Sequence, residues 1–271
     1  MQLALSTWSF SHSAAGVKAG LASAIERTIE TGLGVELFLA WPDPAGLDRA
    51  NWANIRAALD GCTPTIHSGC RFSKTVLTDE FELAAYLGAH VMVTHKVQWG
   101  PRDPELRKRY QEGLRDPDAL DGYRLDEDYL QWALAMAESR GVQLLIENGT
   151  PEMCQIMLER YPQMGFCFDI GHAFNHEQAF PDDPIDSVLD RLGNHMRGVH
   201  VHDNSGRRDD HLPPGDATIP RATWEALGNC LRQHEYQGTI VMELRVPSPL
   251  DVVGRARTFL HGTGVLKPET D

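Results

Sequence analysis

Cysteine is scarce in this chain of 271 residues, and long apolar runs are missing. The five cysteines are odd in number and form no C-x-x-C pair, which argues against a disulfide framework or a cysteine zinc ribbon. No apolar run approaches the roughly 20 residues of a membrane span. The first residues, MQLALSTWSF, lack a basic stretch and a long apolar core, so we expect no secretory signal. Together these features favour a cytoplasmic protein that does not bind membranes.

Positive charge is also in short supply. The chain has 25 lysines and arginines against 38 aspartates and glutamates, which gives a net charge of −13. Proteins that grip nucleic-acid phosphates are usually basic on at least one face, so this balance argues against DNA as a substrate. The first β-like run is not followed by G-x-G-x-x-G, which argues against an open dinucleotide-binding sheet.

Apolar runs typical of β-strands alternate with amphipathic segments along the whole chain. The expected strands are Gln2–Ser6, Gly34–Leu39, Thr63–His67, Val91–His95, Val142–Glu147, Gly165–Asp169, Met196–His202 and Thr239–Glu243. The expected helices are Ala22–Thr31, Asn51–Leu59, Glu80–Leu87, Asp128–Arg140, Pro151–Arg160, Pro184–Leu192, Ala222–His234 and Pro249–Leu260. Several of the strands are continuously apolar, as in parallel strands buried on both faces. The alternation predicts an α/β protein, a single (β/α)8 TIM barrel over residues 1–271, a fold that commonly needs about 250 residues.

Residues that bind metals lie at the ends of the expected strands. They are His67, His95, Glu147, Asp169, His172, His200 and Glu243, with Asp209 and His211 in the loop after the seventh strand. The carboxyl ends of the strands of a barrel share one mouth, so we expect these side chains to converge. Imidazole and carboxylate ligands suit Zn²⁺ or Mn²⁺, and the set is large enough for one to three ions per chain.

A single histidine at a strand end is usually only a polar residue at a loop boundary, so the prediction rests on the coincidence of several. His202 lies two residues after His200 and is assigned to the surroundings of the metal or to the substrate. No site role is assigned to His12, His90, His176, His195, His234 and His261. The connections Val97–Arg124, Ala173–Asp183 and Asp203–Pro220 are longer than a barrel needs, and we expect them to be loops that contact substrate.

Four stretches carry a resemblance to a known family: LLIEN (Leu144–Asn148), FDIGHAF (Phe168–Phe174), GVHVHDNSGRRDDHLPPGDATI (Gly198–Ile219) and VMELR (Val241–Arg245). They resemble the xylose isomerase-like TIM barrel superfamily, which includes sugar phosphate isomerases and epimerases and the endonuclease IV enzymes of AP endonuclease family 2. The resemblance implies a core metal set of Glu147, Asp169, His200 and Glu243. The endonuclease IV pattern of nine ligands for three zinc ions matches His67, His95, Glu147, Asp169, His172, His200, Asp209, His211 and Glu243.

Two reactions on a small, sugar-like or phosphorylated substrate remain open at this point. Hydrolysis of a phosphoester at a multinuclear centre would use the whole ligand set, and the extra ligands favour it. Isomerisation or epimerisation of a sugar would use one metal, with Glu147 and Glu243 as the proton-transfer groups and His172 beside the substrate. A metal-binding barrel without catalysis is the third possibility. The candidate substrate contacts are Trp8, Lys96, Trp99, His202, Arg207, Arg208 and Arg245.

Overall fold

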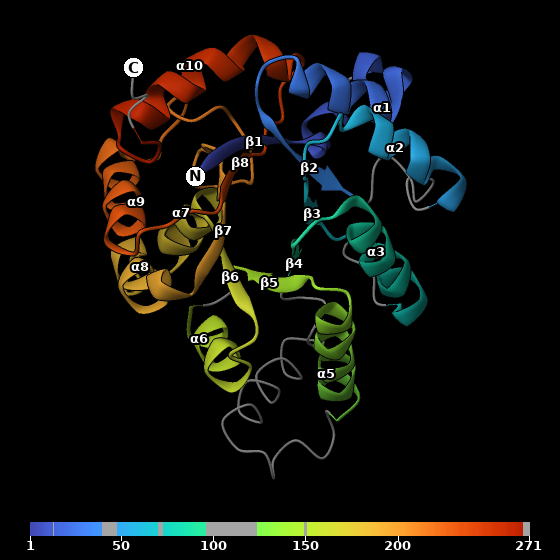
Figure 1. Ribbon diagram of the computed structural model, residues 1–271. Helices are drawn as coiled ribbons and strands as arrows, with labels where there is room; N and C mark the ends of the chain where they lie inside the picture. The colour runs from blue at the N-terminus through green and yellow to red at the C-terminus, as the bar shows by residue number, and fades with distance from the viewer. Residues whose placement is uncertain (13, 40–47, 70–72, 96–123, 149–150, 268–271) are drawn as a thin grey trace.

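Eight parallel strands close into a barrel in the order β1 to β8, and β1 pairs with both β2 and β8. The computed structural model describes residues 1–12, 14–39, 48–69, 73–95, 124–148 and 151–267. The strands are β1 Gln2–Ser6, β2 Gly34–Phe38, β3 Thr65–His67, β4 Val91–His95, β5 Gln143–Glu147, β6 Gly165–Asp169, β7 Met196–Val201 and β8 Thr239–Met242. The predicted TIM barrel is therefore confirmed, and Figure 1 shows the barrel surrounded by its helices.

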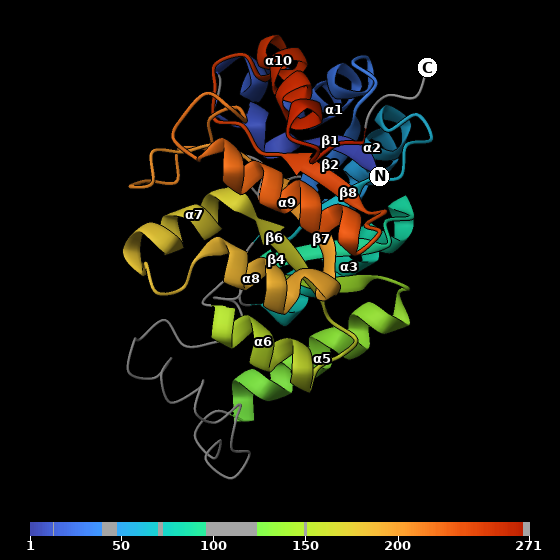
Figure 2. The same cartoon turned by 90° about the vertical axis from the view of Figure 1, so that its left-hand side faces the viewer.

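The helices of the described residues form an outer ring, seen from the side in Figure 2. They are α1 Ala14–Ile29, α2 Trp52–Ala58, α3 Lys74–Leu87, α5 Arg124–Ser139, α6 Pro151–Arg160, α7 Ile170–Ala179, α8 Ile185–Leu192, α9 Arg221–Gln233 and α10 Pro249–Gly262, with 3₁₀ turns η1 Thr7–Phe10, η3 Arg49–Asn51 and η6 Gly193–His195. None of them combines the length and apolarity needed to cross a membrane.

Among the residues that the structure describes, the buried apolar side chains form two separate clusters. The large one lies between strands and helices, and a small one contains Val93, Leu145 and Cys167. Side chains two residues apart on a strand share a face, so each of these three shares its face with the ligand-type residue that ends its strand. A Cβ at Gly198 would lie 2.9 Å from Leu145 Cδ1, so the interior has little spare room at this level. The apolar layer thus forms the floor beneath the ligand-type residues.

Several expected boundaries differ from the structure. The prediction that Ala173–Asp183 is a loop is wrong, because α7 begins at Ile170 directly after β6 and runs to Ala179. Asp169 caps this helix through its carboxylate, which accepts a hydrogen bond of 2.8 Å from His172 N. Helix α3 begins at Lys74 rather than Glu80, behind the N-cap Ser73. The Val97–Arg124 connection lies outside the described residues, except that Arg124 begins α5.

Candidate metal centre

The barrel brings the strand-end residues together at one mouth. His67, His95, Glu147 and Asp169 are the last residues of β3, β4, β5 and β6. His200 is the penultimate residue of β7, and Glu243 directly follows β8. Glu147, Asp169, His200 and Glu243 each offer a ligand atom within 4.8 Å of the others, and we call these four residues the core group.

The Glu147 carboxylate contacts four imidazoles in and around the core group. Its Oε1 lies 2.9 Å from His200 Nδ1 and 3.8 Å from His172 Nδ1. Its Oε2 lies 3.1 Å from His95 Nδ1 and 3.7 Å from His67 Nε2. One carboxylate thus touches four imidazoles from β3, β4, α7 and β7. Glu147 could therefore serve as a metal ligand in either of the two groups of ligand-type residues that contain it.

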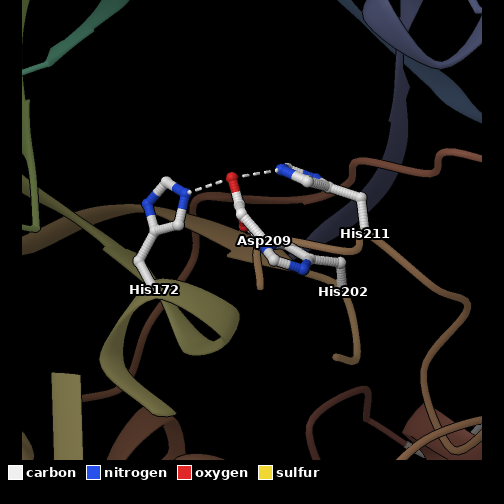
Figure 3. A group of neighbouring side chains, drawn as sticks. All are labelled: His172, His202, Asp209 and His211. Atoms are coloured by element: carbon white, nitrogen blue, oxygen red, sulfur yellow. Dashed lines mark hydrogen bonds and ion pairs between the residues drawn. The ribbon is translucent and has the colours of Figure 1, made fainter. Parts of the chain in front are cut away.

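A second set of ligand-type residues lies beside the core group, and we call it the distal group: His172, His202, Asp209 and His211. Figure 3 shows the Asp209 carboxylate between the rings of His172 and His211, at 3.3 Å and 3.0 Å. The His202 ring stacks on the His211 ring with centroids 3.8 Å apart. His202 Nε2 lies 3.1 Å from Asp169 Oδ1, so His202 also connects the distal group to the core group.

The loop that carries Asp209 and His211 is shaped by another carboxylate. Asp203, which is fully buried, accepts hydrogen bonds from four backbone amides of the loop, among them those of Gly215 and Ala217 at 3.1 Å and 3.0 Å. Its backbone also pairs with Leu212. The expected loop over Asp203–Pro220 is confirmed, whereas its contact with substrate stays a prediction. Within the loop, the backbone amide of Asp216 donates a hydrogen bond of 3.0 Å to the carbonyl of Pro213.

Burial shifts the pKa values of these groups in one direction, and the attraction between neighbouring carboxylates and imidazoles shifts them in the other. Burial raises the pKa of Glu147, but His95, His200 and His67 together hold it well below the usual range. Burial lowers the pKa of His67, but the contact with Glu147 outweighs this and raises it to about 9. Burial likewise lowers the pKa of His172, while Asp169 and Asp209 raise it to well above its ordinary value. Without a metal, therefore, the carboxylates favour protonated imidazoles beside them.

The donor set fits a divalent metal ion. Asp169 Oδ2 and His202 Nδ1 are buried and have no hydrogen-bond partner among the described residues. Leaving buried polar atoms unpaired is costly, so such atoms point to a further ligand. Imidazole nitrogens and carboxylate oxygens are ligand atoms that suit Zn²⁺ and Mn²⁺.

Two residues of this region are not predicted by the sequence patterns. Glu36, in the middle of β2, is fully buried with its Oε2 3.2 Å from His200 Nε2. The sequence feature that could have indicated Glu36 is the presence of a charged residue inside the apolar run GVELF. His12, to which no site role was assigned, contacts Trp8 with ring centroids 4.2 Å apart, and Trp8 in turn contacts His211 at 4.3 Å.

The predicted substrate contacts are only partly placed by the structure. Trp8 lies beside the distal group, and the Arg245 guanidinium lies 5.9 Å from the centre of its ring. Arg207 and Arg208 are exposed on the loop that carries Asp209. Lys96 and Trp99 lie outside the described residues.

The chain is thus a closed parallel barrel with imidazole and carboxylate side chains clustered at its carboxyl mouth. Residues 34–267 match the family described as xylose isomerase-like TIM barrel. The chain belongs to this family, as the sequence motifs implied.

One curated relative and several solved structures are similar to the chain. The uncharacterized protein y4fM of Sinorhizobium fredii is 30% identical over 121 residues, which are 41% of this chain and 35% of that protein. The match therefore spans only about a third of the relative's length.

The solved structures show the same barrel at low sequence identity. A D-tagatose 3-epimerase-like protein is 20% identical, with a TM-score of 0.73 over 98% of this chain and 99% of the other. A D-allulose 3-epimerase from Methylomonas sp. in complex with D-allulose is 15% identical, with a TM-score of 0.68 over 97% of each chain. The IOLI protein with a bound zinc atom is 13% identical, with a TM-score of 0.69 over 97% of this chain and 98% of the other. At these identities the similarity shows the fold alone.

Proposed function

We propose that the chain is a divalent-metal enzyme that isomerises or epimerises a small sugar-like substrate. The observation that carries the proposal is the core group, in which two glutamates, an aspartate and a histidine meet within 4.8 Å. These four residues would hold the metal, as Zn²⁺ or Mn²⁺. Similar barrels bear the names D-tagatose 3-epimerase-like protein and D-allulose 3-epimerase, and the latter was solved with D-allulose bound, which supports a sugar as the substrate class.

Glu147 and Glu243 would be the proton-transfer groups. Glu147 ends β5 and Glu243 follows β8, so they belong to strands that are three positions apart around the closed barrel. Their carboxylates therefore approach the shared space from different sides, and each lies within 3.8 Å of His200 Nδ1. A bound divalent ion would supply polarisation of carbonyl and hydroxyl oxygens on neighbouring carbons. One glutamate would remove the proton from the carbon next to the carbonyl, and the other would return a proton from the opposite side.

Other side chains at the mouth would bind the substrate. Trp8 offers an aromatic face and Arg245 a cationic group beside it. His172 and His202 belong to the distal group, and Arg207 and Arg208 lie on the loop that carries Asp209. These four side chains would hydrogen-bond hydroxyls or a phosphate. Lys96 and Trp99 are kept as candidate contacts from the sequence.

Hydrolysis of a phosphoester is the second candidate function, and the distal group is the observation that favours it. Isomerisation does not require the Asp209 carboxylate to lie between His172 and His211, or His67 and His95 to flank Glu147. In a multinuclear centre these residues, together with Glu147, would hold one or two further ions. Two or three ions activate water and stabilise the leaving oxygen.

Metal analysis combined with a double variant separates the two functions. In Asp209→Asn/His211→Gln, the hydrolase mechanism predicts that the metal content falls by about one ion per chain and that phosphoester cleavage drops by orders of magnitude. The isomerase mechanism predicts unchanged metal content, with retained proton exchange at the substrate carbon and weaker binding.

The matched control is His176→Gln/Asp183→Asn. This pair makes a similar contact of 3.1 Å but involves no residue of either metal group. The assay uses phosphomonoesters, phosphodiesters and ketoses. An intact protein that binds metal but turns over none of them would support the non-catalytic alternative and contradict the proposal.

A further inference from the structure

Glu36 is a buried carboxylate in the middle of β2 that contacts a member of the core group, His200. It lies in β2 opposite Ser6 of β1 and Thr65 of β3 in the strand register. Its side chain is fully buried, and its Oε2 lies 3.2 Å from His200 Nε2. Thr65 Oγ1 lies 3.5 Å from the same oxygen. Burying a carboxylate costs free energy unless the carboxylate is paired. The His200 imidazole is the partner that this burial requires.

His200 connects Glu36 to the core group through its two ring nitrogens. Nε2 faces Glu36, whereas Nδ1 lies 2.9 Å from Glu147 Oε1 and 3.8 Å from Glu243 Oε1. A neutral imidazole carries one N–H and one free lone pair. When Nε2–H donates to Glu36, the lone pair of Nδ1 points at the core group, where a ligand atom is needed.

We propose that Glu36 is a positioning residue that selects the Nε2–H tautomer of His200 and fixes Nδ1 as its metal-binding atom. The proposal rests on the proposed function in that His200 is taken as a metal ligand. The carboxylate–histidine–metal arrangement fixes the ring orientation and increases the basicity of the ligand nitrogen. Glu36 acts through His200, because its own contact is to the nitrogen that faces away from Glu147.

The first experiment measures zinc affinity by competition with a chelator for the wild type, Glu36→Gln and Glu36→Leu. Glu36→Gln keeps the size of the side chain but removes the charge, and Glu36→Leu also removes the hydrogen bond. We expect zinc to bind about 10–100-fold more weakly to these variants, with the larger loss in Glu36→Leu.

The control is Glu80→Gln. It also replaces a buried, hydrogen-bonded carboxylate, in this case one that accepts from Ser68 Oγ at 2.7 Å and from Gly69 N at 2.9 Å. This variant should change zinc affinity less than twofold.

The second experiment reads the binding nitrogen directly and does not depend on a variant that folds. In wild-type protein with ¹⁵N-labelled histidine and ¹¹³Cd in place of zinc, the ¹¹³Cd coupling should appear on His200 Nδ1, while Nε2 stays protonated. Coupling to Nε2, or Glu36 variants that bind zinc as tightly as the wild type, would overturn the role of Glu36 while leaving the metal centre intact. A wild type that binds no metal would overturn the proposed function as well.

Discussion

Gly171 provides a direct test of how the distal group is packed. It is the second residue of α7, and a Cβ built on it would lie 2.0 Å from His202 Cε1 and 2.5 Å from both ring nitrogens. The ring has little room to move, because His202 is fully buried and stacked on His211. The backbone of Gly171 is held as well, since its carbonyl accepts a hydrogen bond of 2.9 Å from Asn204. Gly171→Ala should therefore force the ring away from Asp169.

The magnitude follows from two opposing effects. Overpacking in a buried site costs about 1–3 kcal/mol. Replacing a helical glycine with alanine gains up to about 1 kcal/mol. Gly254→Ala in α10 isolates the second effect, because no atom lies within 4 Å of the Cβ it would add. The free energies of unfolding of the two variants should thus differ by about 1–3 kcal/mol, with Gly171→Ala the less stable.

The assay is urea unfolding of the metal-free protein, repeated in a His202→Ala background. Removal of the ring makes space for the added methyl group, so Gly171→Ala should lose its penalty there, and the coupling energy should be about 1–3 kcal/mol. If Gly171→Ala costs as much without the His202 ring as with it, or stabilises the protein as Gly254→Ala should, the packing argument fails.

Two further predictions concern metal and pH. A chelator should lower the melting temperature, by roughly 5–10 °C if the ion was present at about 100 times its dissociation constant, and added metal should restore it; an unchanged melting temperature after complete metal removal would contradict the site. In the metal-free protein the raised pKa of His67 contributes stability that is fully present below about 6.5 and is lost as pH rises through about 9. Because metal binds deprotonated imidazole, the stabilisation by added zinc should grow across the same interval, and calorimetry with and without zinc at several pH values would show a flat or falling difference if this reasoning is wrong.

The barrel could be predicted from sequence because each signal was local. Continuous apolar runs such as GFCFD mark strands buried on both faces, and β6 is indeed buried along its whole length. The strand-end position of Glu147 and Asp169 then followed from the parallel arrangement. The prediction of a loop over Ala173–Asp183 is wrong because Asp169, a candidate ligand, also caps α7 and allows the helix to begin directly after the strand.

Some residues of the site could not be predicted from the sequence. Their positions depend on how deep they lie in the barrel or on the path of a loop. Glu36 lies inside a strand rather than at its end, so only the closed barrel shows that it lies beneath His200. The position of His202 between Asp169 and His211 depends on the path of the loop after β7. His12 lies only four residues after Trp8, but the fold alone brings Trp8, and with it His12, to His211.

The two ligand groups differ in what holds them in place, and this bears on how the site works. The core group lies on strand ends above a close-packed floor of Val93, Leu145 and Cys167, so the barrel fixes it directly. In the distal group, His172 lies on α7 and His202 directly follows β7, whereas Asp209 and His211 lie on the loop that Asp203 organises through four backbone amides. A ligand set on strands is more rigid than one on a loop. We therefore expect the core group to be held more rigidly than Asp209 and His211, as the proposed proton transfer by Glu147 and Glu243 would require.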